Sequence, residues 1–223
     1  MQRGDAAEDR SQGHALAHDP ATRAIQERFV VYAARDLTQL RLVLRSSPDI
    51  AQRALAAQVL GYARDKQAVV EDLVQPMSDP SEDVRNNAIR AQWVFADRPS
   101  GPSGPIPHIS PEPFIEFLNS PIWSDRNKAS GALMALSASR EAGLLAKLQK
   151  DALIPLVEMA RWKSAGHALP AFVILGRIAG YADDAHTTSG LVAIASSSSR
   201  QRSRDGDNLW SSAGGLSSRV TLE

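Results

Sequence analysis

Two histidines near the start of the chain have the spacing of a metal site on a helix. His14 and His18 lie four residues apart, so a helix would place both rings on one face. Zinc sites in proteins use three or four ligands, and the polar segment around these histidines supplies no obvious third. We therefore interpret the pair as surface residues, and we expect no metal and no cofactor.

The sequence contains no recognisable catalytic motif. His108, His167 and His186 are far apart, and there is no G-x-S-x-G elbow or H-E-x-x-H pair. Gly101 and Gly104 lie among prolines, without the strand before and the helix after that a phosphate loop needs. The absence of cysteine excludes disulfides, thiolate ligands and a cysteine nucleophile. These features predict a protein that is not an enzyme.

One short stretch combines cations with an aromatic ring. Arg161, Trp162 and Lys163 are consecutive, with His167 nearby, and could bind an anion or an acidic segment of a partner. A turn between two helices with a half-buried Trp162 explains the same residues, and we favour that interpretation. Arg161, Trp162 and Lys163 remain candidates for partner binding.

The clearest pattern in the sequence is a helix start that occurs three times. In each copy a serine or aspartate precedes a proline, and an arginine follows five residues after the proline. Serine and aspartate cap helices, and proline fits the first helical turn because no backbone N–H is needed there. The first two copies are 32 residues apart, a period typical of repeat architectures. The structural repeat positions are Pro48, Arg53, Pro80, Arg85, Pro121 and Arg126.

Composition and apolar spacing both favour packed helices. Apolar residues make up 43% of the chain but aromatic residues only 5%, and alanine and leucine are strong helix formers. Leu37, Leu40 and Leu44 show the spacing of an amphipathic helix. A fourth unit follows Leu144 but lacks the proline and the arginine. We predict an all-α fold, a right-handed solenoid of about four antiparallel helix pairs with disordered ends.

The domain boundaries follow from changes in composition. We expect a disordered leader over residues 1–19, a solenoid over 20–185, and a Ser/Arg-rich, mostly disordered tail over 186–223. Residues 98–113 form a Pro/Gly-rich insertion within the solenoid. This insertion could be a ligand for an SH3-like or WW-like module, but we favour a spacer between repeats.

The repeated proline and arginine resemble those of HEAT repeats, especially the short bacterial type also found in phycobilisome lyase-like proteins. The resemblance covers roughly residues 36–183 and implies two antiparallel helices per unit. It is specific for fold and does not identify a function. Independently of the resemblance, we expect Arg53, Arg85 and Arg126 to link adjacent turns through aspartate side chains and exposed carbonyls.

The function expected from this fold is a non-enzymatic scaffold or adaptor that binds a protein or peptide on the solenoid surface. The second helix of each pair would line one side of that surface. Trp93 and Trp123 could belong to the core or anchor a partner. The candidate partner-binding residues on these helices are Gln52, Gln58, Asn86, Asn87, Arg90, Asn127 and Lys128.

Two alternative functions stay open. A lyase-like HEAT protein acting on a tetrapyrrole chromophore would need a pocket and acid–base groups that the sequence does not identify. A weak nucleic-acid binder would need a basic strip, whereas 25 lysines and arginines balance 25 acids. We therefore do not expect nucleic acid to be the main partner.

The sequence also bears on location and assembly. No apolar run is long enough for a membrane span, and residues 1–18 lack the apolar segment of a secretory signal. We expect a monomeric cytoplasmic protein, or a periplasmic one if the true start lies upstream of Met1.

Overall fold

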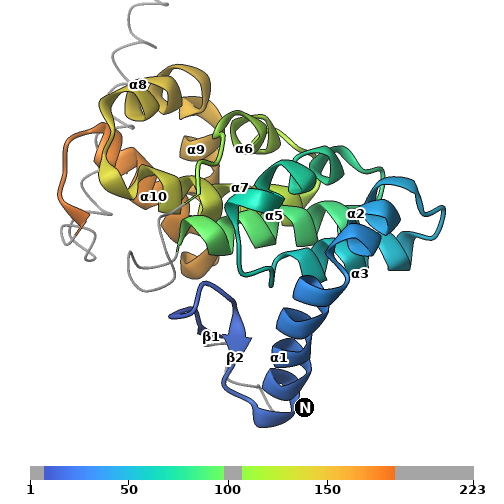
Figure 1. Cartoon of the computed structure of the whole chain (residues 1–223). Helices are drawn as coiled ribbons and strands as arrows, with labels where there is room; N and C mark the ends of the chain where they lie inside the picture. The colour runs from blue at the N-terminus through green and yellow to red at the C-terminus, as the bar shows by residue number, and fades with distance from the viewer. Residues whose placement is uncertain (1–7, 98–106, 184–223) are drawn as a thin grey trace, which may run out of the picture.

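The structure, a computed structural model, describes residues 8–97 and 107–183. These residues are mostly helical, which confirms the predicted all-α class (Figure 1). The tail expected over 186–223 lies outside the described residues. The longer helices are α1 (Pro20–Arg35), α2 (Leu37–Ser46), α3 (Ile50–Leu60), α5 (Glu82–Ala96), α7 (Trp123–Leu136), α8 (Ala142–Asp151) and α10 (Ala165–Ile178). The shorter elements are β1 (Glu8–Asp9), β2 (Leu16–Ala17), α4 (Gln67–Val70), η1 (Glu71–Leu73), η2 (Gln75–Ser78), α6 (Glu112–Phe117), η3 (Ser137–Ser139) and α9 (Leu153–Met159).

Four helices pack in a row in the order α3, α5, α7 and α10. Each is preceded in the chain by a helical segment that packs against it: α2 on α3, η1 and η2 on α5, α6 on α7, and α8 and α9 on α10. Leu60, Phe95, Leu133 and Ile174, one from each helix of the row, are fully buried. The core therefore runs along the whole row and is shared between neighbouring segments.

The residue before each repeated proline has a different role from the predicted one. We expected it to cap the helix, with the proline in the first turn, but α3 begins at Ile50 and is capped by Asp49. The serine or aspartate instead holds the turn that leads into the helix, by accepting a hydrogen bond from the backbone N–H two residues later. These bonds run from the N–H of Asp49 to Ser47 (3.2 Å), from that of Ser81 to Asp79 (2.9 Å) and from that of Ile122 to Ser120 (3.1 Å).

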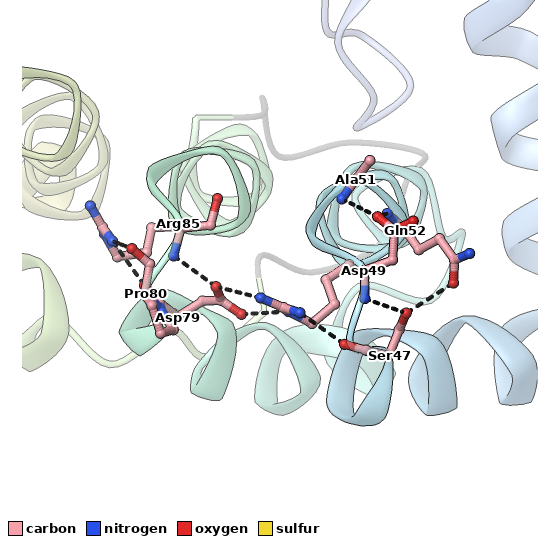
Figure 2. Close-up of polar contacts among 9 residues, drawn as sticks. Ser47, Asp49, Ala51, Gln52, Asp79, Pro80 and Arg85 are labelled. Atoms are coloured by element: carbon pink, nitrogen blue, oxygen red, sulfur yellow. Dashed lines mark hydrogen bonds and ion pairs between the residues drawn. The ribbon is translucent and has the colours of Figure 1, made fainter.

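The repeated arginine links each unit to the next (Figure 2). Arg53 on α3 donates to both carboxylate oxygens of Asp79, at 2.8 and 3.1 Å, and to the carbonyl of Ser47 at 2.8 Å. The hydrogen bonds from Arg53 hold the pKa of Asp79 below its usual value. The link that the sequence predicted is thus made by one guanidinium, which joins its own turn to the turn of the following helix.

The second arginine repeats this geometry, and the third pairs with a glutamate of a following helix. Arg85 on α5 donates to Asp125 on α7, with its Nε 3.1 Å from Oδ2, and to the carbonyl of Asp79 at 2.8 Å. Arg126 on α7 contacts Glu158 on α9 at 2.9 Å. We call these three contacts, Arg53–Asp79, Arg85–Asp125 and Arg126–Glu158, the arginine relay.

Residues 8–19 differ from the disordered leader that we expected over 1–19, and residues 1–7 lie outside the described residues. Strands β1 and β2 pair antiparallel, with Glu8 opposite Ala17 and Asp9 opposite Leu16. We call residues 8–17 the hairpin. Its His14, Ala15 and Leu16 are buried against the rest of the protein. The polar composition of this segment predicts disorder in isolation, but these three side chains find tertiary partners.

The end of the Pro/Gly-rich insertion is also part of the packed structure. Pro107 and Ile109 are buried, and α6 begins at Glu112, inside the range 98–113 that we expected to be a spacer. Residues 98–106 lie outside the described residues, so the interpretation of that part as a spacer stays a prediction.

Removing a carboxylate of the relay should lower the free energy of unfolding, and the loss should be larger for a buried carboxylate than for an exposed one. Asp125 is buried, and Asp125→Ala leaves the guanidinium of Arg85 without its counter-ion, so unfolding should become easier by about 3 kcal/mol. Glu158 is largely exposed, and Glu158→Ala should cost less than about 1 kcal/mol. Urea unfolding of the two variants measures both values, and equal losses would contradict a stabilising role for the buried pair.

A second prediction concerns the close approach of α5 and α7. A Cβ atom added at Gly131 would lie 2.8 Å from the ring of Trp93, so Gly131→Ala should destabilise the protein by about 1–3 kcal/mol. Gly166, at the start of α10, has open space around its Cα, and Gly166→Ala should be neutral or stabilising by up to about 1 kcal/mol. Thermal unfolding of the pair tests this, and a stabilised Gly131→Ala would show that the helices are not in close contact.

Candidate interaction surface

Four of the predicted partner-binding residues come together on one side of the helix row. Gln58 on α3 and Asn87 and Arg90 on α5 line the same small cavity, together with Gln26 of α1. Lys128 on α7 is close enough to Arg90 to repel it electrostatically. We call the surface formed by Gln58, Asn87, Arg90 and Lys128 the row face.

The row face is not bare, because the hairpin lies against it. Glu8 of the hairpin forms an ion pair with Arg90 and a second one with Arg10 at 3.0 Å. Arg10 also pairs with Asp97 at the end of α5, and its guanidinium lies over the ring of Trp93, 5.1 Å from the centroid. Arg90 of the row face, with Trp93 and Asp97 from the same helix and its end, therefore already binds a short polypeptide segment.

Backbone and ring contacts hold β2 of the hairpin and the two residues before it. The hydroxyl of Tyr62 donates to the carbonyl of Ala15 at 2.9 Å. The ring of His14 stacks on that of Tyr62 at 5.9 Å between centroids, with the planes 12° apart. The side-chain oxygen of Gln26 accepts from the backbone N–H of Ala17 at 2.7 Å. These contacts fix the path of the hairpin beside α1 and α3.

His14 is a buried neutral histidine and does not pair with His18 as a metal ligand. Its Nδ1 lies 3.0 Å from Nζ of Lys66, and because an ammonium group only donates, Nδ1 accepts and the ring proton is assigned to Nε2. Burial, with the nearby charges of Lys66 and Arg64, lowers the pKa of His14 to about 4. His18 is exposed, and no group of three potential metal ligands occurs within residues 8–97 and 107–183.

The remaining predicted residues lie elsewhere. Asn86 and Asn127 are half-buried, and each precedes a row-face residue by one position, which turns it about 100° around its helix. Gln52 is near the start of α3, where it accepts from the hydroxyl of Ser47 at 2.9 Å. The partner-binding residues predicted from the sequence therefore lie on two sides of the same helices. They were chosen by residue type, without regard to the direction in which each side chain leaves its helix.

Arg161, Trp162 and Lys163 form the turn between α9 and α10. Trp162 is half-buried and packs between the guanidinium of Arg126, 5.4 Å from its ring centroid, and the ring of Trp123. Arg161 and Lys163 are exposed. This agrees with the interpretation of the segment as an inter-helix turn, and Trp162 supports the third contact of the relay.

Sequence reasoning missed most of the residues that contact the hairpin. Glu8, Arg10, Tyr62 and Lys66 were not assigned to any site, and His14 was assigned to the surface. The sequence contained one indication that this segment is buried, because Ala15 and Leu16 are consecutive apolar residues within a mostly polar segment. Most of the partners could not be identified, because Tyr62, Lys66, Arg90 and Asp97 lie 47 to 87 residues further along the chain than the hairpin residues they contact.

No protein-family model matches the sequence, and no curated protein matches it significantly. Among the described residues, no helix combines the length and the apolar character needed to cross a membrane. The function must therefore be inferred from the row face itself.

The buried His14 predicts a pH-dependent hairpin. Protonation of His14 would place a cation beside Lys66 and Arg64, so docking is most favourable above pH 6.5, the value for a free histidine, and weakens as the pH falls towards 4. Between pH 7 and pH 5, the free energy of local opening at the Ala17 amide should fall by about 2 kcal/mol. Hydrogen exchange measures this value, and in His14→Gln it should stay nearly constant. Equal pH dependence in both proteins would exclude His14 as the cause.

Proposed function

We propose that the protein is a non-enzymatic scaffold, built as a HEAT-like α-solenoid, that binds a protein or peptide partner on the row face. The observation that carries this proposal is the hairpin itself: Arg90 of the row face pairs with Glu8, and the neighbouring Tyr62 donates to the backbone carbonyl of Ala15, so this surface already holds a short polypeptide segment.

The helix row supports the architectural part of the proposal. Each helix of the row follows a shorter helical segment that packs on it, and the arginine at the same position of each repeat pairs with an acid of the next unit. Stacked units of this kind bury a continuous core and present the side chains of successive helices on one surface. Such a surface is long enough to follow an extended peptide.

The chemistry of the row face favours a peptide over the two alternatives. With the hairpin in place, the cavity beside Gln58 and Asn87 has a volume of about 80 Å³, whereas pockets for small-molecule ligands measure about 300–1,000 Å³, so a tetrapyrrole does not fit there in this state. Arg90 pairs with Glu8, and Lys128 lies near the same carboxylate, so with the hairpin in place these two cations do not form a continuous basic strip. Side-chain amides and a tyrosine hydroxyl are suited to peptide groups and carboxylates.

Site-specific crosslinking in cells of the source organism tests the proposal. A photo-crosslinking amino acid at position 58 should capture a defined protein, because Gln58 is exposed and lies on the row face. The matched control is position 149, because Gln149 is also an exposed glutamine but lies on α8. Mass spectrometry should recover the partner severalfold more strongly from position 58. Equal recovery from both positions, or none from position 58, would reject the row face as the binding surface.

A further inference from the structure

We propose that the hairpin is a displaceable internal ligand of the row face, and that the partner binds through an acidic, extended segment whose carboxylate replaces Glu8 at Arg90 and Lys128. This inference rests on the proposed function and specifies both the chemistry of the partner and the regulation of the surface.

The charges around Glu8 indicate the chemistry of the ligand. Arg90 pairs with Glu8, and Lys128 is near enough to feel both of them. Burial and the positive charges of Arg90 and, less strongly, Arg10 lower the pKa of Lys128, whereas Glu8 raises it. Departure of the hairpin would leave these two cations facing each other without their carboxylate. A carboxylate from another chain would relieve the same repulsion.

The contacts of Arg10 do not change this balance. Arg10 pairs with Asp97 as well as with Glu8, so it leaves together with the hairpin and returns Asp97, whose side chain is 38% exposed, to solvent. Arg90 and Lys128 instead belong to α5 and α7 and stay in place. The part of the row face that remains is therefore the part that selects for an acid.

The hairpin is held weakly enough to be displaced. Its strands have two residues each, and within residues 8–17 the buried apolar side chains are those of Ala15 and Leu16. A two-stranded hairpin is marginal on its own. Its ion pairs with the rest of the protein, Glu8–Arg90, Asp9–Arg23 and Arg10–Asp97, are all partly exposed and therefore contribute little each. In Figure 1 the hairpin lies outside the helix row, and the relay involves none of its residues.

The hairpin also fills the row face incompletely. The cavity of about 80 Å³ lies beside Ala15 and is lined by polar side chains, those of Gln26, Gln58 and Asn87 among them. An alanine methyl group does not reach these groups, but a larger polar side chain at the same position could. Next to it, Tyr62 donates to a backbone carbonyl, a contact that any peptide can accept. A partner segment with an acid and a longer polar residue would thus bind better than the hairpin.

A labelled peptide tests this in the full-length protein. The probe is a fluorescein-labelled synthetic peptide with the sequence of residues 8–18, and binding is measured by fluorescence anisotropy. In Glu8→Lys the internal hairpin is repelled by Arg90 and Lys128, so the probe should bind about tenfold or more tightly than to the unchanged protein. Adding Arg90→Glu to this variant should abolish binding. A probe whose own glutamate is replaced by lysine should not bind.

Three outcomes would overturn the inference. One is equal affinity of the probe for Glu8→Lys and the unchanged protein. Another is probe binding that survives Arg90→Glu while circular dichroism shows both variants folded. The third is a Glu8→Lys dimer, seen by size-exclusion chromatography, that excludes the probe, since the row face would then accept a second copy of the chain. Crosslinking at position 58 separates the two proposals: a captured partner with no probe binding leaves the scaffold standing and rejects the acidic segment.

Discussion

The arrangement of the helix row depends on a guanidinium that is shared between two units. Arg53 and Arg85 each donate to a carbonyl in the turn before their own helix and to the carboxylate before or at the start of the next one. The planar fork of arginine can serve both acceptors at once, which the single ammonium of lysine does less well. Because Asp79 and Asp125 are buried, their charges are compensated only when neighbouring helices are in register. The ion pairs therefore favour one alignment of neighbouring helices in the row.

The same helices carry the relay and the row face on different sides. On α5, Arg85 reaches Asp125 and Arg90, five residues later, reaches Glu8. Five residues correspond to about 500°, or a net rotation of about 140°, so one side chain faces the next unit while the other faces the hairpin. The close contact of Gly131 with Trp93 brings α7 against α5 and sets the position of Lys128 relative to Arg90. The surface chemistry is therefore a consequence of how the row is packed.

The sequence predicted what is encoded locally and repeated. Pro48, Pro80 and Pro121 marked the helix starts, because the pattern recurs at fixed spacing. Arg53 and Arg85 make the expected links to an aspartate and a turn carbonyl, whereas Arg126 pairs with a glutamate. The hairpin could not be predicted in this way. His14 contacts Lys66 across 52 residues, and Glu8 contacts Arg90 across 82. The polar composition of residues 1–19 predicted disorder despite the two apolar residues that follow His14. Helical phase, applied to α5 and α7, would have separated Asn87 and Lys128 from Asn86 and Asn127.

The central claim is that the hairpin occupies the row face and leaves it when the charge of Glu8 is reversed. The chain has no cysteine, so spin labels can be attached at only two introduced positions, Gln12 in the hairpin and Ser139 after α7, both exposed. Pulsed electron–electron double resonance measures the distance between the two labels. The protein with Glu8 should give one narrow distance distribution, and Glu8→Lys should give a broad distribution centred at a longer distance. Identical distributions for the two proteins would contradict a hairpin held by Arg90 and Lys128.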